Sequence, residues 1–112
     1  MRYKRVETGI LFFKFFYKIG VVCYEKVAKN PPADPVEKMA IIEKGKAALQ
    51  RSIELRPEYF ESIVYLNLLY RQQALMEPDL AKQAELLAKA EALKNQAVEI
   101  VRKRKAASAK KS

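Results

Sequence analysis

Residues 34–57 read DPVEKMAIIEKGKAALQRSIELRP, a run of helix-forming residues with a proline near each end. Asp34 is suited to cap a helix N-terminus, and Pro35 to occupy the first helical turn, where no N–H donor is needed. Apolar residues then recur at helical spacing until Pro57, which cannot continue a helix. The segment therefore predicts a helix between the two prolines. Gly45 lies on its apolar face, which predicts the close approach of a neighbouring helix.

Similar breaks divide the rest of the chain into three more helical segments, of which two end before a proline and the last ends where its apolar stripe stops. The four helices are expected at about residues 6–29, 35–55, 58–76 and 79–105. Because their connections are short, they should pack as antiparallel neighbours in a single all-α domain over residues 1–105. Residues 106–112 have no apolar stripe and are predicted to form a basic, disordered tail.

Residues 9–24 (GILFFKFFYKIGVVCY) are strongly apolar. Lys14 and Lys18 interrupt this run, no small-residue cleavage site follows it, and a membrane span needs about 20 apolar residues. We therefore predict a helix that is buried on more than one side. Peripheral membrane contact through its phenylalanines stays open as an alternative. The absence of a clear signal peptide favours the cytoplasm, with membrane association or export left open.

The composition argues against catalysis and against metal or cofactor chemistry. The chain has one cysteine and no histidine, so it lacks the commonest general base and the commonest metal ligand. Its three glycines are isolated and form no phosphate-binding loop. Cys23 lies inside an apolar helix and is expected to be a small buried residue. We predict no enzymatic activity, no cofactor, no metal and no small-molecule substrate.

The formal net charge is +9, and much of it is concentrated at the C-terminal end. The basic cluster comprises Arg102, Lys103, Arg104 and Lys105. Clustered basic residues can bind nucleic acid or an anionic surface, but no aromatic residues accompany these four to stack on bases. A nucleic-acid partner is therefore disfavoured. Basic residues here also favour the helix C-terminus through the macrodipole.

Two parts of the chain resemble tetratricopeptide (TPR) units, which are hairpins of two helices. Residues 16–23 (FYKIGVVC) resemble a first helix, and residues 46–57 (KAALQRSIELRP) resemble a second helix with its exit, where Arg56 replaces the usual capping Asp. A second unit follows Pro57, with Ile63, Leu66-Asn67 and Tyr70 at first-helix positions and Ala90 and Ala97 at second-helix positions. Over most of residues 14–105 the chain resembles the C-terminal part of bacterial TPR proteins with lengthened repeats. The resemblance implies two antiparallel hairpins stacked as a right-handed superhelix.

The resemblance also implies where a partner would bind, because the first helix of each TPR hairpin lines the inner surface. The candidates for this groove are Tyr17, Val21, Tyr24, Tyr65, Leu68, Arg71 and Gln72. The expected function is a non-enzymatic scaffold or adaptor that binds another protein or peptide. Two alternatives stay open: a membrane-surface protein anchored by the first helix, and a helical bundle that self-associates through it.

Overall fold

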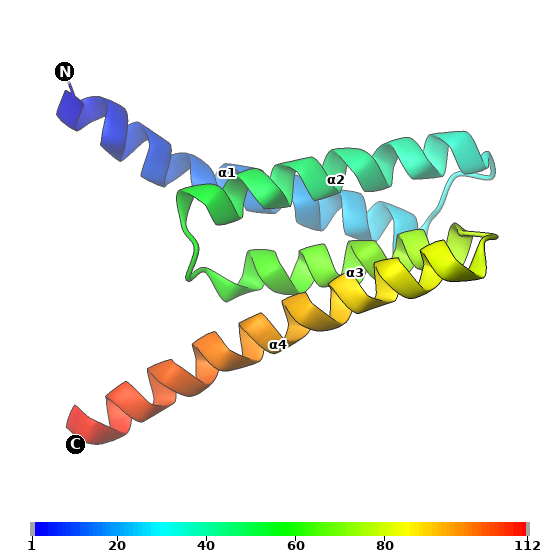
Figure 1. Ribbon diagram of the computed structural model, residues 1–112. Coiled ribbons are helices and arrows are strands. Elements are labelled where there is room, and N and C mark those ends of the chain that lie inside the picture. The colour runs from blue at the N-terminus through cyan, green and yellow to red at the C-terminus, as the bar shows by residue number, and fades with distance from the viewer. Residues whose placement is uncertain (1, 112) are drawn as a thin grey trace.

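The computed structural model describes the backbone of residues 2–111 and the side chains of residues 12–110. Four helices follow one another in this part of the chain (Figure 1). They are α1 (Arg2–Lys29), α2 (Pro35–Leu55), α3 (Phe60–Met76) and α4 (Leu80–Lys111). The predicted all-α fold is confirmed.

A capping side chain marks the start of α2 but not that of α3. The side chain of Asp34 accepts a hydrogen bond from the Val36 backbone N–H at 2.9 Å, as its position before Pro35 predicted. Helix α3 begins at Phe60, two residues later than predicted, and its N-cap Tyr59 makes no side-chain capping bond. A residue without a capping oxygen gives the start of a helix little definition.

The C-terminal end of α4 differs from the prediction. We expected the helix to end near residue 105 and the tail to be disordered, but α4 continues to Lys111. Residues 106–110 are exposed, so burial of apolar side chains does not explain this extension. The reason is local: alanine is the best helix former, and Ala106, Ala107 and Ala109 dominate the segment.

The helices form two antiparallel hairpins, α1 with α2 and α3 with α4 (Figure 1). Helix α3 also contacts both helices of the first hairpin. Within the described part of the chain, α4 contacts α3 alone, so the four helices do not close into a bundle. The first hairpin and α3 enclose the core, which is formed by Val27, Ile42, Leu49, Leu66 and Leu69.

Glycines set the distance between α1 and α2. A Cβ atom on Gly20 would lie 2.2 Å from Cγ of Leu49, and one on Gly45 would lie 2.8 Å from Cβ of Cys23. Real Cβ atoms do not approach other carbons so closely. The close approach predicted at Gly45 is therefore confirmed, and Gly20 makes a second one.

We predicted that α1 is buried on more than one side, and it contacts both α2 and α3, but part of its apolar surface is exposed. Phe13 and Val27 are buried, at 4% and 1% exposure. Phe12, Phe15 and Val22 are 47%, 56% and 66% exposed, because neither α2 nor α3 covers their side of the helix. Helix α1 therefore has one face in the core and one apolar face in solvent.

Candidate functional site

A row of aromatic rings runs along the contact between α1 and α3. Tyr17 of α1 lies edge-to-face against Tyr59 and Tyr65, with ring centroids 5.2 and 5.7 Å apart. Tyr24, two helical turns further along α1, lies 5.6 Å from Tyr65, and Phe13 closes the other end at 4.8 Å from Tyr59. Edge-to-face pairs stabilise by about 0.5–1.5 kcal/mol beyond their buried area, so the row holds the two helices in register.

Six of the seven groove candidates lie beside this row. Tyr17, Val21 and Tyr24 share one side of α1, and Tyr65, Leu68 and Gln72 share one side of α3, by helical spacing. We call these six residues the open face. All six are half-buried. Neither α2 nor α4 lies over the α1 residues of this face: α4 does not contact α1, and α2 packs against a neighbouring side of α1 at Gly20 and Cys23.

Arg71, the seventh candidate, is turned away from the open face. Its Nε donates to Oδ1 of Asn67 at 2.8 Å, and its guanidinium pairs with Glu91 of α4 at 3.1 Å. Arg71 therefore ties α3 to α4. The alignment with TPR units assigns Arg71 to the first helix of a hairpin and does not identify its partner on α4.

Glu61 joins the open face from the first turn of α3, one turn before Tyr65. Its Oε1 is buried and has no hydrogen-bond partner in the described structure. Burial is the main cause of a raised pKa at both Tyr17 and Tyr59, and the Glu61 carboxylate raises each pKa further. Glu61 is not among the site residues predicted from the sequence. Its spacing from Tyr65, Leu68 and Gln72 is the signal that could have placed it here.

Tyr70 marks the opposite side of α3. Its ring lies beneath the ammonium groups of Lys46 from α2 and Lys89 from α4, at 4.5 and 5.8 Å from the ring centroid. Lys46 also donates to Oε1 of Gln73 at 2.7 Å. Tyr70 is half-buried like Tyr65. Its ring contacts side chains of α2 and α4 and does not belong to the open face.

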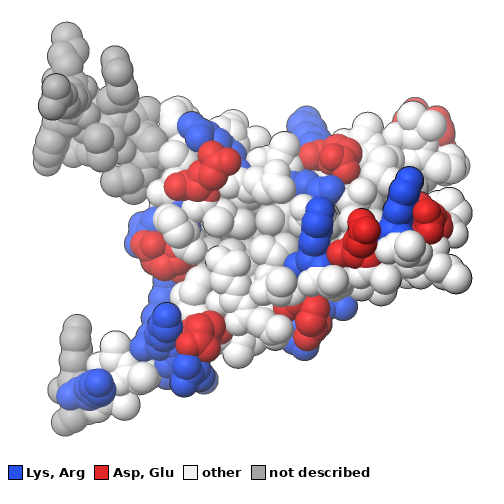
Figure 2. Space-filling model, in the orientation of Figure 1, with Lys and Arg blue, Asp and Glu red and all other residues white. Residues whose placement is uncertain are grey.

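The basic cluster at the end of α4 is partly engaged within the molecule. Arg102 pairs with Glu99, and Arg104 donates to the Glu58 carbonyl at 2.7 Å while its guanidinium lies over the Phe60 ring. Lys105 is exposed. On the face drawn in Figure 2, basic and acidic residues alternate over the body, and basic residues gather at the α4 end.

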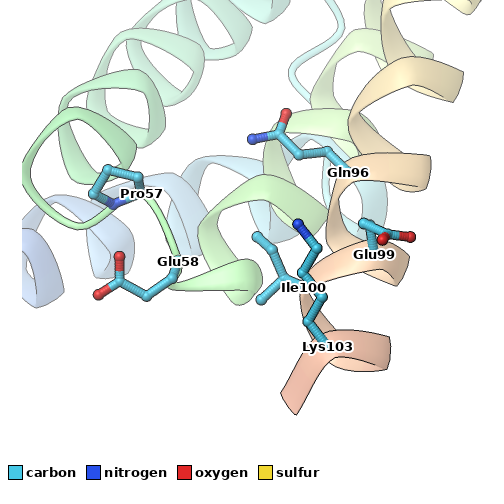
Figure 3. A pocket seen from close by; sticks show the side chains of 6 residues that line it. All are labelled: Pro57, Glu58, Gln96, Glu99, Ile100 and Lys103. Carbon is cyan, nitrogen blue, oxygen red and sulfur yellow. The ribbon is translucent and has the colours of Figure 1, made fainter. Parts of the chain in front are cut away.

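Lys103 lines a hollow of about 340 Å³ between the α2–α3 turn and α4 (Figure 3). Pro57 and Glu58 lie across it from the α4 residues Gln96, Glu99, Ile100 and Lys103. The hollow is separate from the open face, and the Glu99 carboxylate beside it is already paired with Arg102. Because Glu99 is paired, few charged groups that line this hollow are left to bind a ligand.

Cys23 is buried against α2, as predicted. Burial raises the pKa of its thiol, and the nearby Lys44 ammonium acts in the opposite direction. Among the described residues, no group of three or more His, Cys, Asp or Glu side chains could hold a metal ion. Over the same residues, none of the helices is both long and apolar enough to span a bilayer.

Comparison of the chain with protein-family models, with curated proteins and with solved structures gives no match.

Proposed function

We propose that this chain is a non-enzymatic protein-interaction module of the TPR type, and that it binds an extended segment of a partner protein across the open face. The observation that carries the proposal is the tyrosine row formed by Tyr17, Tyr24, Tyr59 and Tyr65. Tyrosine offers a large apolar ring and a hydroxyl group, loses little conformational entropy on binding, and is enriched among the residues that dominate binding energy.

The arrangement of the hairpins supports the same proposal. Each helix contacts its neighbour in the chain, and α3 also contacts α1, so the two first helices of the hairpins lie together. Repeat proteins build their binding surfaces from such stacked units, each of which contacts only its neighbours. The right-handed superhelix that the resemblance implies is part of this proposal.

Glu61 gives the proposed surface a chemical preference. Its buried, unpaired Oε1 is a site where a hydrogen-bond donor is missing. The Glu61 side chain is half-buried, so its carboxylate can turn to meet a donor supplied by a ligand, which would remove the penalty of about 1–3 kcal/mol that an unsatisfied buried acceptor carries. The tyrosine rings nearby favour a cationic donor, because their faces attract ammonium and guanidinium groups. We therefore expect a segment with a basic side chain close to Glu61.

The test is selection of short random peptides, displayed on phage, against the full chain. Selected peptides should carry a basic residue beside apolar ones, and they should shift the NMR signals of Tyr17, Tyr24 and Gln72. Tyr65→Ala should weaken binding by about tenfold or more, as loss of an aromatic anchor does. Glu61→Gln should weaken it mainly for peptides that keep the basic residue.

Tyr70→Ala is the matched control, because Tyr70 is a half-buried tyrosine on the same helix but on the opposite side. If Tyr70→Ala weakens binding as much as Tyr65→Ala does, the loss reports stability and the open face is not the binding site. Signal shifts confined to other surfaces would reject the proposal as well.

A further inference from the structure

The exposed side of α1 forms a second apolar surface, distinct from the open face. We call it the outer face; its residues are Phe12, Phe15, Phe16, Ile19 and Val22. The phenylalanine rings cluster, with centroids 5.5 Å apart for Phe15 and Phe16 and 6.1 Å apart for Phe12 and Phe15. Apolar residues scattered singly need no explanation, but a contiguous exposed cluster of this kind marks an interaction site.

A hollow of about 380 Å³ lies beside this cluster, where α1 meets α2. Its apolar lining comes from Phe15, Ile19, Val22 and Cys23. The two charged residues that line it are Lys18 of α1 and Lys44 of α2, and both are exposed. The surface is thus an apolar strip with a lysine on each helix beside it.

The spacing of the outer face suits a helical partner. Its residues recur at three- and four-residue intervals, the pattern with which one helix packs its side chains against another. The hollow beside them would accept a side chain that projects from the partner. A planar surface such as a lipid bilayer supplies no side chain to fill it.

We propose that the outer face binds an amphipathic helix of another protein, whose apolar stripe covers Phe15, Ile19 and Val22 and whose acidic side chains meet Lys18 and Lys44. Charge argues against a second copy of this chain as the occupant, because two outer faces would bring like-charged lysines together. The proposal does not rest on the function proposed for the open face, since no residue is shared between the two surfaces.

Two synthetic peptides test the proposal. Both are alanine-rich helices with the same stripe of leucines; one carries glutamates beside the stripe and the other carries lysines. Fluorescence anisotropy with the full chain should show binding of the glutamate peptide and at least about tenfold weaker binding of the lysine peptide, a difference of about 1.4 kcal/mol. Exchanging both lysines in the variant K18E/K44E should reverse this preference.

Val22→Glu supplies the control for the apolar strip. Val22 is 66% exposed, so its substitution leaves the core intact, and circular dichroism should show an unchanged fold. This variant should lose the glutamate peptide, while Val98→Glu, which adds the same charge at an exposed valine of α4, should keep it. Equal binding of the two peptides by the unaltered chain would overturn the proposal, and so would glutamate-peptide binding that survives Val22→Glu.

The other occupants are tested on the same variants. Sedimentation equilibrium that finds a dimer, abolished by Val22→Glu, would assign the outer face to a second copy and overturn the proposal. Flotation with phosphatidylcholine vesicles, with and without phosphatidylserine, is the membrane arm. Binding to phosphatidylserine vesicles that Val22→Glu abolishes, without binding of the glutamate peptide, would overturn it in favour of a lipid surface.

Discussion

Gly20 determines how closely α1 and α2 approach at the centre of the first hairpin. Leu49 is fully buried, and its Cγ and both Cδ atoms fill the space where a Cβ on Gly20 would lie. Glycine normally costs a helix about 1 kcal/mol relative to alanine, so here the requirement for packing outweighs helix propensity.

Gly20→Ala should therefore lower the free energy of unfolding, although the same substitution stabilises an isolated helix. We expect a net loss of about 1–2 kcal/mol, because overpacking typically costs about 1–3 kcal/mol and the gain in helix propensity offsets part of it. Urea denaturation of the two proteins measures the difference.

Leu49→Ala provides the control, because it removes the atoms that the new methyl group would meet. Gly20→Ala made in the Leu49→Ala background should be neutral or stabilising, which gives a large coupling energy between the two sites. Additive effects would show that the contact between Gly20 and Leu49 does not limit the packing of the hairpin.

At the scale of the elements, small residues control the seam between α3 and α4. Ala90 and Ala97 are buried, at 0% and 5% exposure, at positions where the TPR resemblance places small residues. The side chains of Phe60 and Val64 on α3 lie opposite the second of these alanines. The seam thus depends on alanines that leave space for larger residues on the facing helix.

Ala90→Leu should push α4 away from α3 and lower the free energy of unfolding by about 1–3 kcal/mol. Ala92→Leu is the matched control, since Ala92 is exposed on the same helix, and it should change stability by less than about 0.5 kcal/mol. Thermal unfolding followed by circular dichroism measures both. Equal effects of the two substitutions would mean that α4 does not pack on α3 through Ala90.

The number and approximate limits of the helices could be predicted from the sequence, because prolines and capping residues act locally. The exposed side of α1 could not, since a helix that is apolar nearly all round gives no sign of which side the rest of the chain covers. The end of α4 was missed for the opposite reason: residues 106–111 have no apolar stripe to signal a helix, and the helix propensity of their alanines is a weaker signal.

In the candidate site, some features follow from the local sequence and others depend on residues far away in the chain. Tyr17, Tyr24 and Tyr65 were predicted to lie together because the TPR resemblance assigns them to the first helices of the two hairpins. The direction of Arg71 depends on Glu91, which is 20 residues away and on another helix. Oε1 of Glu61 is buried although the residue as a whole is half-buried, and the spacing of Glu61 within α3 does not report the burial of this atom.

At the scale of the whole molecule, the arrangement of the helices is open. The Cα radius of gyration is 16.0 Å, whereas a compact chain of this length has a value of about 13 Å. Two features account for the difference: α4 is longer than α3 and does not return to the first hairpin, and the N-terminal part of α1 projects beyond α2 (Figure 1).

Small-angle X-ray scattering of the monomer should therefore give a radius of gyration near 16.0 Å, allowing for a hydration layer that adds slightly to it. The control is the scattering mass, which must equal that of one chain of 12.9 kDa. A value near 13 Å, the expectation for a compact chain, would show that the helices close into a bundle and that the open face is covered.

The isolation of α4 has a consequence for exchange between molecules. Because α4 contacts α3 alone within the described residues, it can detach and leave the first hairpin and α3 packed together. The surface of α3 that α4 leaves exposed is then the same as the surface exposed on any other copy whose α4 has detached. At high concentration, α4 of one molecule can therefore pack on α3 of another through the same contacts that it makes within one chain. This exchange is the low-cost route to a domain-swapped dimer.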